Sequence, residues 1–318
     1  MKITALYLFA LLSITTSFGS IDSKTTKLQV IATNSIIGDW VKKVAEDKVD
    51  LTIMIGPDTD NHTFEPTSQD STRLTKADVI FENGLGLEFW LNALYKSSRS
   101  KAKRVALSNE LLDLLPIDCH GHFKCKHSHH QEYDPHTWLN PNYVISMVQR
   151  IINTLIKEDP KNANFYKENG LQYIDELKKL DSWIKERIAG TKEVAGIPVS
   201  NRKLVTNHDS FRYFARQYGF IPVGDILGST STENVDPSAS QFANLVKIIR
   251  KNKIPAIFGE NIQSSVLVNN LAEEAKLPQP KLLYTEALSK ENGPAKNYIE
   301  LMKYNVNILV ESLKQPNE

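Results

Sequence analysis

The sequence predicts an α/β protein of two lobes, each a mainly parallel four-stranded sheet flanked by helices, joined by one long spine helix. Three observations lead to this fold class. Short apolar and β-branched runs alternate with helical stretches, as in parallel sheets that are covered on both faces. The runs form two groups of four, and a long helical pattern separates the groups. A chain of 318 residues also exceeds one ordinary core and fits two domains.

The eight predicted strands are short segments in which Val, Ile, Leu and Phe are frequent. The first group comprises residues 28–33, 49–55, 78–83 and 104–107. The second group comprises residues 203–206, 220–226, 256–259 and 281–285. We therefore expect an N-terminal lobe over 20–158 and a C-terminal lobe over 193–318.

The long helical pattern begins after Pro160 and runs from Lys161 to Ala189, with Gly190 as a C-cap. Apolar residues recur along it at helical spacing: Ile174, Leu177, Trp183 or Ile184, and Ile188. At a rise of 1.5 Å per residue, this helix is about 40 Å long. The segment 159–192 is thus expected to connect the two lobes as a rigid spine. The alternative is an ordinary surface helix within one lobe.

The N-terminus has the features of an export signal. Lys2 supplies a positive charge, residues 5–12 form an apolar core, and Ser17 to Gly19 provide small residues at a cleavage site. We expect residues 1–19 to be removed near Gly19 and the mature protein to be periplasmic. The alternative is a buried N-terminal helix. The apolar run is shorter than the roughly 20 residues of a membrane span, so no stable membrane insertion is expected. Without a cysteine near the cut, no lipid-modified N-terminal cysteine is expected either.

Charge and composition are those of a globular protein without polyanionic partners. The chain has 38 Lys and Arg against 37 Asp and Glu, for a net charge of +1. This balance indicates neither a nucleic acid nor an anionic membrane as a partner. We expect a monomer.

All eight histidines lie in segments that suit metal binding. Neutral imidazole is the commonest protein ligand for zinc and related ions. His62, His136 and His208 each occupy a short segment with Asp or Asn and an aromatic residue nearby, and the other five fall within residues 120–130. The chain is therefore interpreted as a metal-handling protein.

Residues 117–133 are polar and aperiodic and are expected to form a histidine-rich surface loop. Its five histidines are candidates for weak, auxiliary metal capture: His120, His122, His127, His129 and His130. The alternative is a surface loop with adventitious metal affinity. Cys119 and Cys125 lie within the loop and could form a disulfide in an oxidising compartment. They could instead supply thiolate ligands.

The main candidate site lies in the cleft between the lobes. Ligands of open α/β sheets bind beyond the carboxyl ends of the strands. His62 follows one predicted strand, His208 follows another, and His136 closes the histidine-rich loop. Glu260 and Glu286 each directly follow a strand of the second group, so either could supply a carboxylate.

Three imidazoles and one carboxylate complete the tetrahedral coordination of zinc and leave no open position for a substrate. Such a site stores or carries an ion rather than catalysing a reaction. Asp60, Asp134 and Asp209 are candidates for orienting the imidazole rings from outside. With ordinary histidines, metal affinity is expected to fall as the pH drops through about 6.5.

Six motifs in a fixed order resemble the periplasmic receptors of zinc and manganese ABC importers, the ZnuA/TroA-like family. The motifs are DNHTFEPTSQD (60–70), ENGLGLEFW (82–90), DPHTWLNP (134–141), NHDSFRYFARQYG (207–219), FGE (258–260) and TEALSKENGPAKNYIELMKYN (285–305). The resemblance implies His62, His136, His208 and Glu286 as ligands, with Glu260 as a neighbouring residue. It also implies an ABC permease as a transient partner and no enzymatic activity.

The resemblance favours Zn²⁺ as the bound ion, because zinc receptors of this kind have a histidine as third ligand and manganese receptors usually have a glutamate. A nitrogen-rich ligand set agrees with zinc. Mn²⁺ or Fe²⁺ is the alternative within the family. A secreted zinc hydrolase is a remote alternative, disfavoured because the chain lacks HExxH and a nucleophile elbow. An adhesin-like surface protein is a third alternative.

Three features depart from the family pattern: Asn61 where proline is frequent, Glu286 in place of aspartate, and a short, cysteine-flanked loop.

Overall fold

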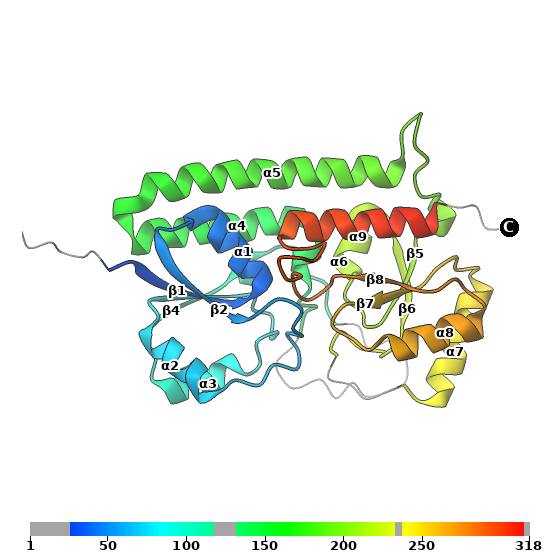
Figure 1. Cartoon of the computed structure of the whole chain (residues 1–318), viewed down its shortest axis with the longest axis horizontal. Helices are drawn as coiled ribbons and strands as arrows, with labels where there is room; N and C mark the ends of the chain where they lie inside the picture. Colours follow the sequence, from blue (N-terminus) through cyan, green and yellow to red (C-terminus); the bar gives the residue numbers. More distant parts are fainter. Residues whose placement is uncertain (1–25, 118–131, 233–236, 315–318) are drawn as a thin grey trace, which may run out of the picture.

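The computed structural model describes residues 26–117, 132–232 and 237–314, which form two α/β lobes lying side by side under one long helix (Figure 1). The two-lobe α/β fold predicted from the sequence is thus confirmed. No helix within these ranges is both long and apolar enough to cross a membrane.

The N-terminal lobe contains a four-stranded parallel sheet with the order β2-β1-β3-β4. Its strands are β1 (Leu28–Asn34), β2 (Val49–Ile55), β3 (Val79–Glu82) and β4 (Lys103–Ala106). Alternate residues of β1 face opposite sides: Val30 packs into the large core, whereas Ile31 packs with Leu74 and Leu91. Helices therefore cover both faces of the sheet: α1 (Ser35–Ala45) on one, and α2 (Ser68–Lys76) with α3 (Leu91–Ser98) on the other.

The C-terminal lobe contains four parallel strands that are hydrogen-bonded as two pairs, β5 with β6 and β7 with β8. The strands are β5 (Lys203–Thr206), β6 (Ile221–Asp225), β7 (Phe258–Glu260) and β8 (Lys281–Leu283). A single four-stranded ladder, as expected from the sequence, is not found among the described residues. β5 and β7 are neighbours, but both are short, and β5 is irregular between Leu204 and Val205. Few positions remain where a continuous ladder could form. The helices of this lobe are α6 (Arg212–Tyr218), α7 (Ala239–Lys251) and α8 (Ser265–Ala275).

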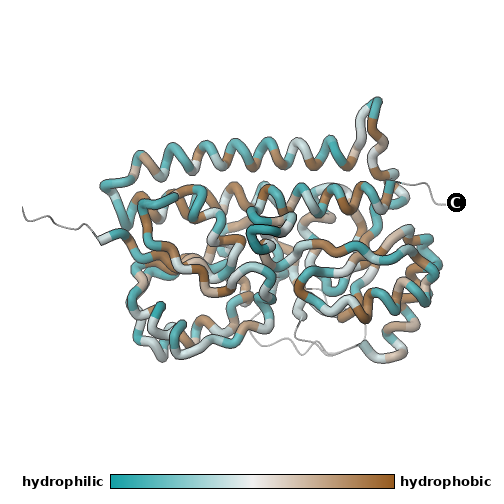
Figure 2. Tube along the Cα trace, in the orientation of Figure 1, coloured by the Kyte–Doolittle hydropathy of each residue, from teal (hydrophilic) through white to brown (hydrophobic). Residues whose placement is uncertain are grey.

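The spine helix α5 (Ala163–Ala189) packs on α4 (Pro141–Glu158) and on α9 (Tyr298–Leu313), which both lie beneath it in Figure 1. It ends at Gly190, which has a positive φ of 81°. It starts two residues later than predicted, because Pro160–Asn162 form a 3₁₀ turn. Its turns alternate between hydrophilic and hydrophobic residues (Figure 2).

The buried face of α5 contains Ile174, Leu177, Ile184 and Ile188, whereas Trp183 is only partly buried. These residues belong to one apolar core that includes residues from both lobes, such as Val30 and Phe258. The helix is therefore a connecting element rather than a surface helix of one lobe. We retain 20–158, 159–192 and 193–318 as proposed domain limits.

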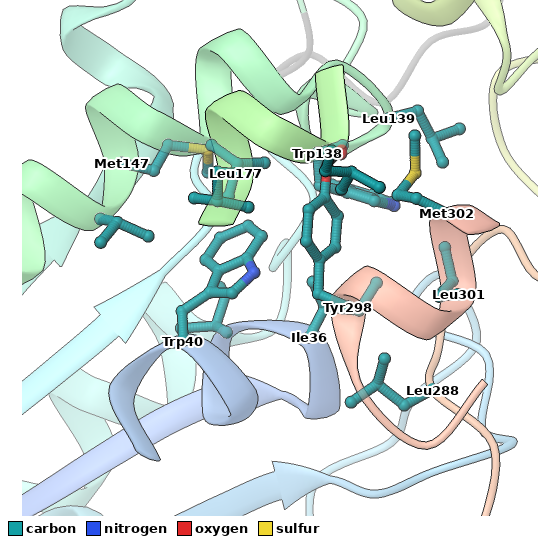
Figure 3. Packing of buried hydrophobic residues seen from close by; sticks show 14 of the residues in the cluster. Ile36, Trp40, Trp138, Leu139, Met147, Leu177, Leu288, Tyr298, Leu301 and Met302 are labelled. Carbon is teal, nitrogen blue, oxygen red and sulfur yellow. Dashed lines mark hydrogen bonds between the residues drawn. The ribbon is translucent and has the colours of Figure 1, made fainter. Parts of the chain in front are cut away.

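Aromatic residues join the two lobes beneath the spine (Figure 3). Trp40 of α1 meets Tyr298 of α9 edge to face, with ring centroids 5.6 Å apart. The Tyr298 hydroxyl donates to the Trp138 carbonyl at 2.6 Å, and Trp138 Nε1 donates to the Thr285 carbonyl at 2.7 Å. These bonds fix the segments that carry His136 and Glu286 relative to each other.

Substitution of Leu177, a fully buried residue of the spine helix, is predicted to destabilise the protein. Leu177→Ala should lower the free energy of unfolding by about 2–5 kcal/mol, because it removes buried methyl groups and leaves a cavity. Leu171 lies on the same helix and is 50% exposed. Leu171→Ala should therefore change the free energy of unfolding by less than about 0.5 kcal/mol. Urea denaturation of both variants checks this. Equal effects would contradict the assigned buried face.

Candidate metal centre

Four buried side chains converge between the lobes, each from a loop near the end of a secondary-structure element. His62 lies between β2 and α2, and His136 precedes the short helix Thr137–Leu139 before α4. His208 lies between β5 and α6, and Glu286 lies between β8 and α9. His62 is 2% exposed and the other three are fully buried. One nitrogen or oxygen atom from each residue lies within 4.8 Å of those of the others.

The distances between these atoms match the edges of a small coordination polyhedron. His136 Nε2 lies 3.3 Å from His62 Nε2 and 3.1 Å from His208 Nε2. Glu286 Oε1 lies 3.1 Å from His136 Nε2 and 3.4 Å from His208 Nε2. Two ligand atoms of a tetrahedral ion with bonds of about 2.0–2.1 Å lie about 3.3 Å apart. Four of the six distances therefore have the length expected for a four-coordinate ion, whereas His62 Nε2 and Glu286 Oε2 lie farther apart, at 3.7 Å.

Carboxylates outside the cluster turn two of the imidazoles inward. Asp134 Oδ1 lies 2.7 Å from His136 Nδ1 and accepts the His136 backbone N–H at 3.0 Å. Glu260 Oε2 lies 2.6 Å from His208 Nδ1, and Glu260 Oε1 accepts the His208 backbone N–H at 3.0 Å. The Thr285 hydroxyl donates to Glu260 Oε2 at 2.7 Å. Contact with Nδ1 leaves Nε2 of both rings pointing into the cluster, which is the usual arrangement around metal-binding histidines.

Asp60 and Asp209 have other contacts. Asp60 accepts the backbone N–H of His62 at 2.9 Å, so it holds the main chain rather than the ring. Its second oxygen accepts the Thr232 hydroxyl at 2.5 Å and the Gln263 amide at 3.2 Å, which ties the His62 loop to the C-terminal lobe. Asp209 lies 3.5 Å from Arg212, and no hydrogen bond or ion pair joins it to a ring of the cluster in the described ranges.

Sequence reasoning missed Asn61 and Trp138 as residues that shape the site. Asn61 Nδ2 donates to the Glu286 carbonyl at 2.7 Å and to Glu286 Oε2 at 3.1 Å. The ring of Trp138 lies 5.2 Å from that of His136. The position of Asn61 beside His62 and its departure from the proline of the family pattern were the available signals, but neither identified its partner, which lies 225 residues away.

The electrostatics of the cluster are strongly shifted from ordinary values. Burial lowers the pKa of His62 to about 3, against the opposing charge of Glu286. Burial also acts to lower the pKa of His136, but Glu286 and Asp134 outweigh it and raise that pKa to about 9. For His208, burial is likewise outweighed, here by Glu260 and Glu286, and its pKa lies well above 6.5. Burial would raise the pKa of Glu286, but His136 and His62 hold it well below its usual value. The cluster thus favours a bound positive charge.

The five histidines of the predicted loop and the two cysteines beside them lie outside the described residues, and their predicted roles stay predictions. They are His120, His122, His127, His129, His130, Cys119 and Cys125.

Two α/β lobes braced by a long helix, with metal-binding side chains buried between them, define a metal-binding solute receptor. The chain belongs to the family described as zinc-uptake complex component A, periplasmic, whose profile matches residues 30–312. This is a family of substrate-binding proteins of ABC importers, so the chain is a binding protein and not an enzyme. The resemblance noted from the motifs is confirmed, and a secreted zinc hydrolase is excluded.

Solved structures show the same fold. The periplasmic zinc-binding protein TroA from Treponema pallidum matches with a TM-score of 0.78 and 27% identity, over 91% of this chain and all of that one. A cadmium-bound periplasmic metal-binding protein from Candidatus Liberibacter asiaticus matches with a TM-score of 0.76 and 25% identity, over 90% of this chain and all of that one.

Curated relatives include a metal ABC transporter substrate-binding lipoprotein, FimA, from Streptococcus parasanguinis. It is 31% identical over 97% of this chain and 96% of its own length. The manganese ABC transporter substrate-binding lipoprotein PsaA from Streptococcus mitis is 31% identical over 90% of this chain and 89% of its own length.

Metal affinity is predicted to fall as the pH drops below about 9, rather than only below the ordinary histidine pKa of about 6.5. The metal requires an unprotonated His136 Nε2, and the pKa of His136 is raised to about 9. For each proton that the metal must displace, the apparent metal affinity should fall about tenfold for every pH unit below that pKa. Competition titrations at pH 6, 7, 8 and 9 measure the slope. An affinity that does not change between pH 7 and 9 would contradict the raised pKa.

Proposed function

We propose that this protein is a periplasmic receptor that binds one zinc ion and delivers it to an ABC-type permease for import. The ligands are His62, His136, His208 and Glu286. The observation that carries the proposal is the buried cluster itself, in which three Nε2 atoms and a carboxylate oxygen from both lobes face one another. Four protein ligands complete a tetrahedral site, which suits carriage of an ion rather than catalysis.

Zinc is favoured over manganese by the donor atoms. Three nitrogens and one oxygen form a low-coordinate, nitrogen-rich set, whereas manganese suits sites rich in oxygen. A manganese or iron receptor is the second candidate, because PsaA from Streptococcus mitis is named for manganese.

Transport is supported by the relatives and by the N-terminus. The relatives FimA and PsaA are named as substrate-binding components of ABC transporters. Residues 1–19 have the pattern of an export signal, with cleavage near Gly19. The mature chain therefore meets its metal outside the cytoplasm and contacts the permease transiently, and we propose that it acts as a monomer.

Removing any one ligand is predicted to abolish tight zinc binding. His62→Ala, His136→Ala, His208→Ala and Glu286→Gln should each lower zinc affinity by at least about 100-fold, because a three-ligand site leaves buried polar atoms unsatisfied. Glu291→Gln is the matched control, since it changes an exposed carboxylate of the same segment. Competitive titration with zinc and manganese measures both affinities. Unchanged zinc affinity in His208→Ala, or tighter manganese binding by the unaltered protein, would contradict the proposal.

Deleting residues 120–130 is predicted to leave one tight zinc equivalent and to remove additional weak ones. Histidine-rich tracts are expected to bind metal more weakly than a preformed site, because ordering a flexible chain costs conformational entropy. Titration calorimetry of the deletion variant counts the equivalents, and uptake at scarce zinc measures delivery. If stoichiometry and uptake were both unchanged, the loop would have no role in metal capture.

A further inference from the structure

Asn61 is a buried residue whose side chain, among the described residues, hydrogen-bonds to Glu286. It is 1% exposed. Its amide nitrogen donates to two acceptors of that residue, the main-chain carbonyl at 2.7 Å and Oε2 at 3.1 Å. Both hydrogens of the amide are therefore used on Glu286, one on its backbone and one on its carboxylate.

The orientation of the Asn61 amide follows from its neighbours. Reversing the group would place Oδ1 against the Glu286 carbonyl and carboxylate oxygens, which are acceptors only. In the observed orientation Oδ1 has no hydrogen-bond donor within the described ranges. The contribution of this side chain to the site thus comes from Nδ2.

The two oxygens of Glu286 have different surroundings. Oε1 faces imidazole nitrogens, 3.1 Å from His136 Nε2 and 3.4 Å from His208 Nε2. Oε2 lies 3.1 Å from Asn61 Nδ2 and 3.7 Å from His62 Nε2. Asn61 therefore holds Oε2, whose imidazole neighbour is 3.7 Å away, whereas Oε1 lies closer to two of the imidazole nitrogens.

Neighbouring contacts keep Asn61 at this distance. The backbone N–H of Asp58 donates to the Leu288 carbonyl at 2.8 Å. The Asp58 side chain accepts the Lys290 N–H at 3.3 Å. The loop that carries Asn61 and His62 is thus attached along the segment that carries Glu286, across the junction of the lobes.

We propose that Asn61 is a positioning residue that selects the metal by making Glu286 bind through one oxygen. Carboxylates can bind an ion through one oxygen or through both. With Oε2 held by Asn61, the set is three nitrogens and one oxygen, which zinc accepts as a tetrahedral site. A freed carboxylate supplies a second oxygen and favours ions that prefer more oxygen ligands, such as Mn²⁺. This inference rests on the proposed ligand set.

The experiment compares Asn61→Ala and Asn61→Leu with Asn207→Ala. The leucine variant keeps the branched shape and the number of heavy atoms and removes the donor, so a defect caused only by the cavity of the alanine variant would not appear in it. Asn207 is the matched control, because it is also buried and directly precedes a cluster histidine. No side-chain hydrogen bond from Asn207 to the four cluster residues is found in the described ranges. Competitive titrations give zinc and manganese affinities, and X-ray absorption at the zinc edge gives the number of ligands.

We expect both Asn61 variants to lose about 10–100-fold in zinc affinity, the usual effect of removing a residue that orients a metal ligand. Manganese affinity should fall less, so the zinc-to-manganese ratio drops about tenfold, and the absorption spectrum should show an additional oxygen. Asn207→Ala should have the same ratio of zinc to manganese affinity as the unaltered protein and the same number of zinc ligands. An unchanged ligand number in both Asn61 variants, or an equal change in Asn207→Ala, would overturn the inference. If the unaltered protein bound no zinc tightly, the proposed function itself would fail.

Discussion

The structure depends on one constraint: three imidazole nitrogens and a carboxylate oxygen face one another in a buried space. Neighbouring donors lie only 3.1–3.4 Å apart. Lone pairs so close together repel, and burial removes the water that would otherwise solvate them. A cation at the centre, or protons on the rings, relieves the conflict. Asp134, Glu260 and Asn61 form the surroundings that hold this arrangement, because each orients a cluster residue from outside.

The fold keeps this arrangement in place by joining both lobes next to the site. Trp138 and Tyr298 link the segments near His136 and Glu286, and α5 packs against both α4 and α9. Because each lobe supplies ligands, a bound ion also holds the lobes together. The continuous core under the spine is expected to restrict lobe motion to small rearrangements around the ion. Asp60, hydrogen-bonded to both Thr232 and Gln263, further ties the His62 loop to the C-terminal lobe.

The strand positions and the cluster histidines were predictable because they follow local rules. Apolar runs mark strands, and the carboxyl ends of parallel strands place loop residues such as His62 and His208 together. These rules left Glu260 and Glu286 as equal candidates, since both follow strands. The structure separates them by direction: Glu260 contacts His208 Nδ1, and Glu286 faces the Nε2 atoms. The role of Asn61 and the paired strands of the second lobe depend on contacts between distant segments, which no local pattern contains.

The most direct test of the account is a crystal structure of the zinc-loaded protein, with anomalous scattering measured on both sides of the zinc edge. We predict one strong peak in the interlobe cluster, about 2.0–2.1 Å from each of the three Nε2 atoms and from one oxygen of Glu286. No water should be bound to the ion. A peak elsewhere, or an ion there that lacks one of the three histidines or binds water, would contradict a closed site built for carriage.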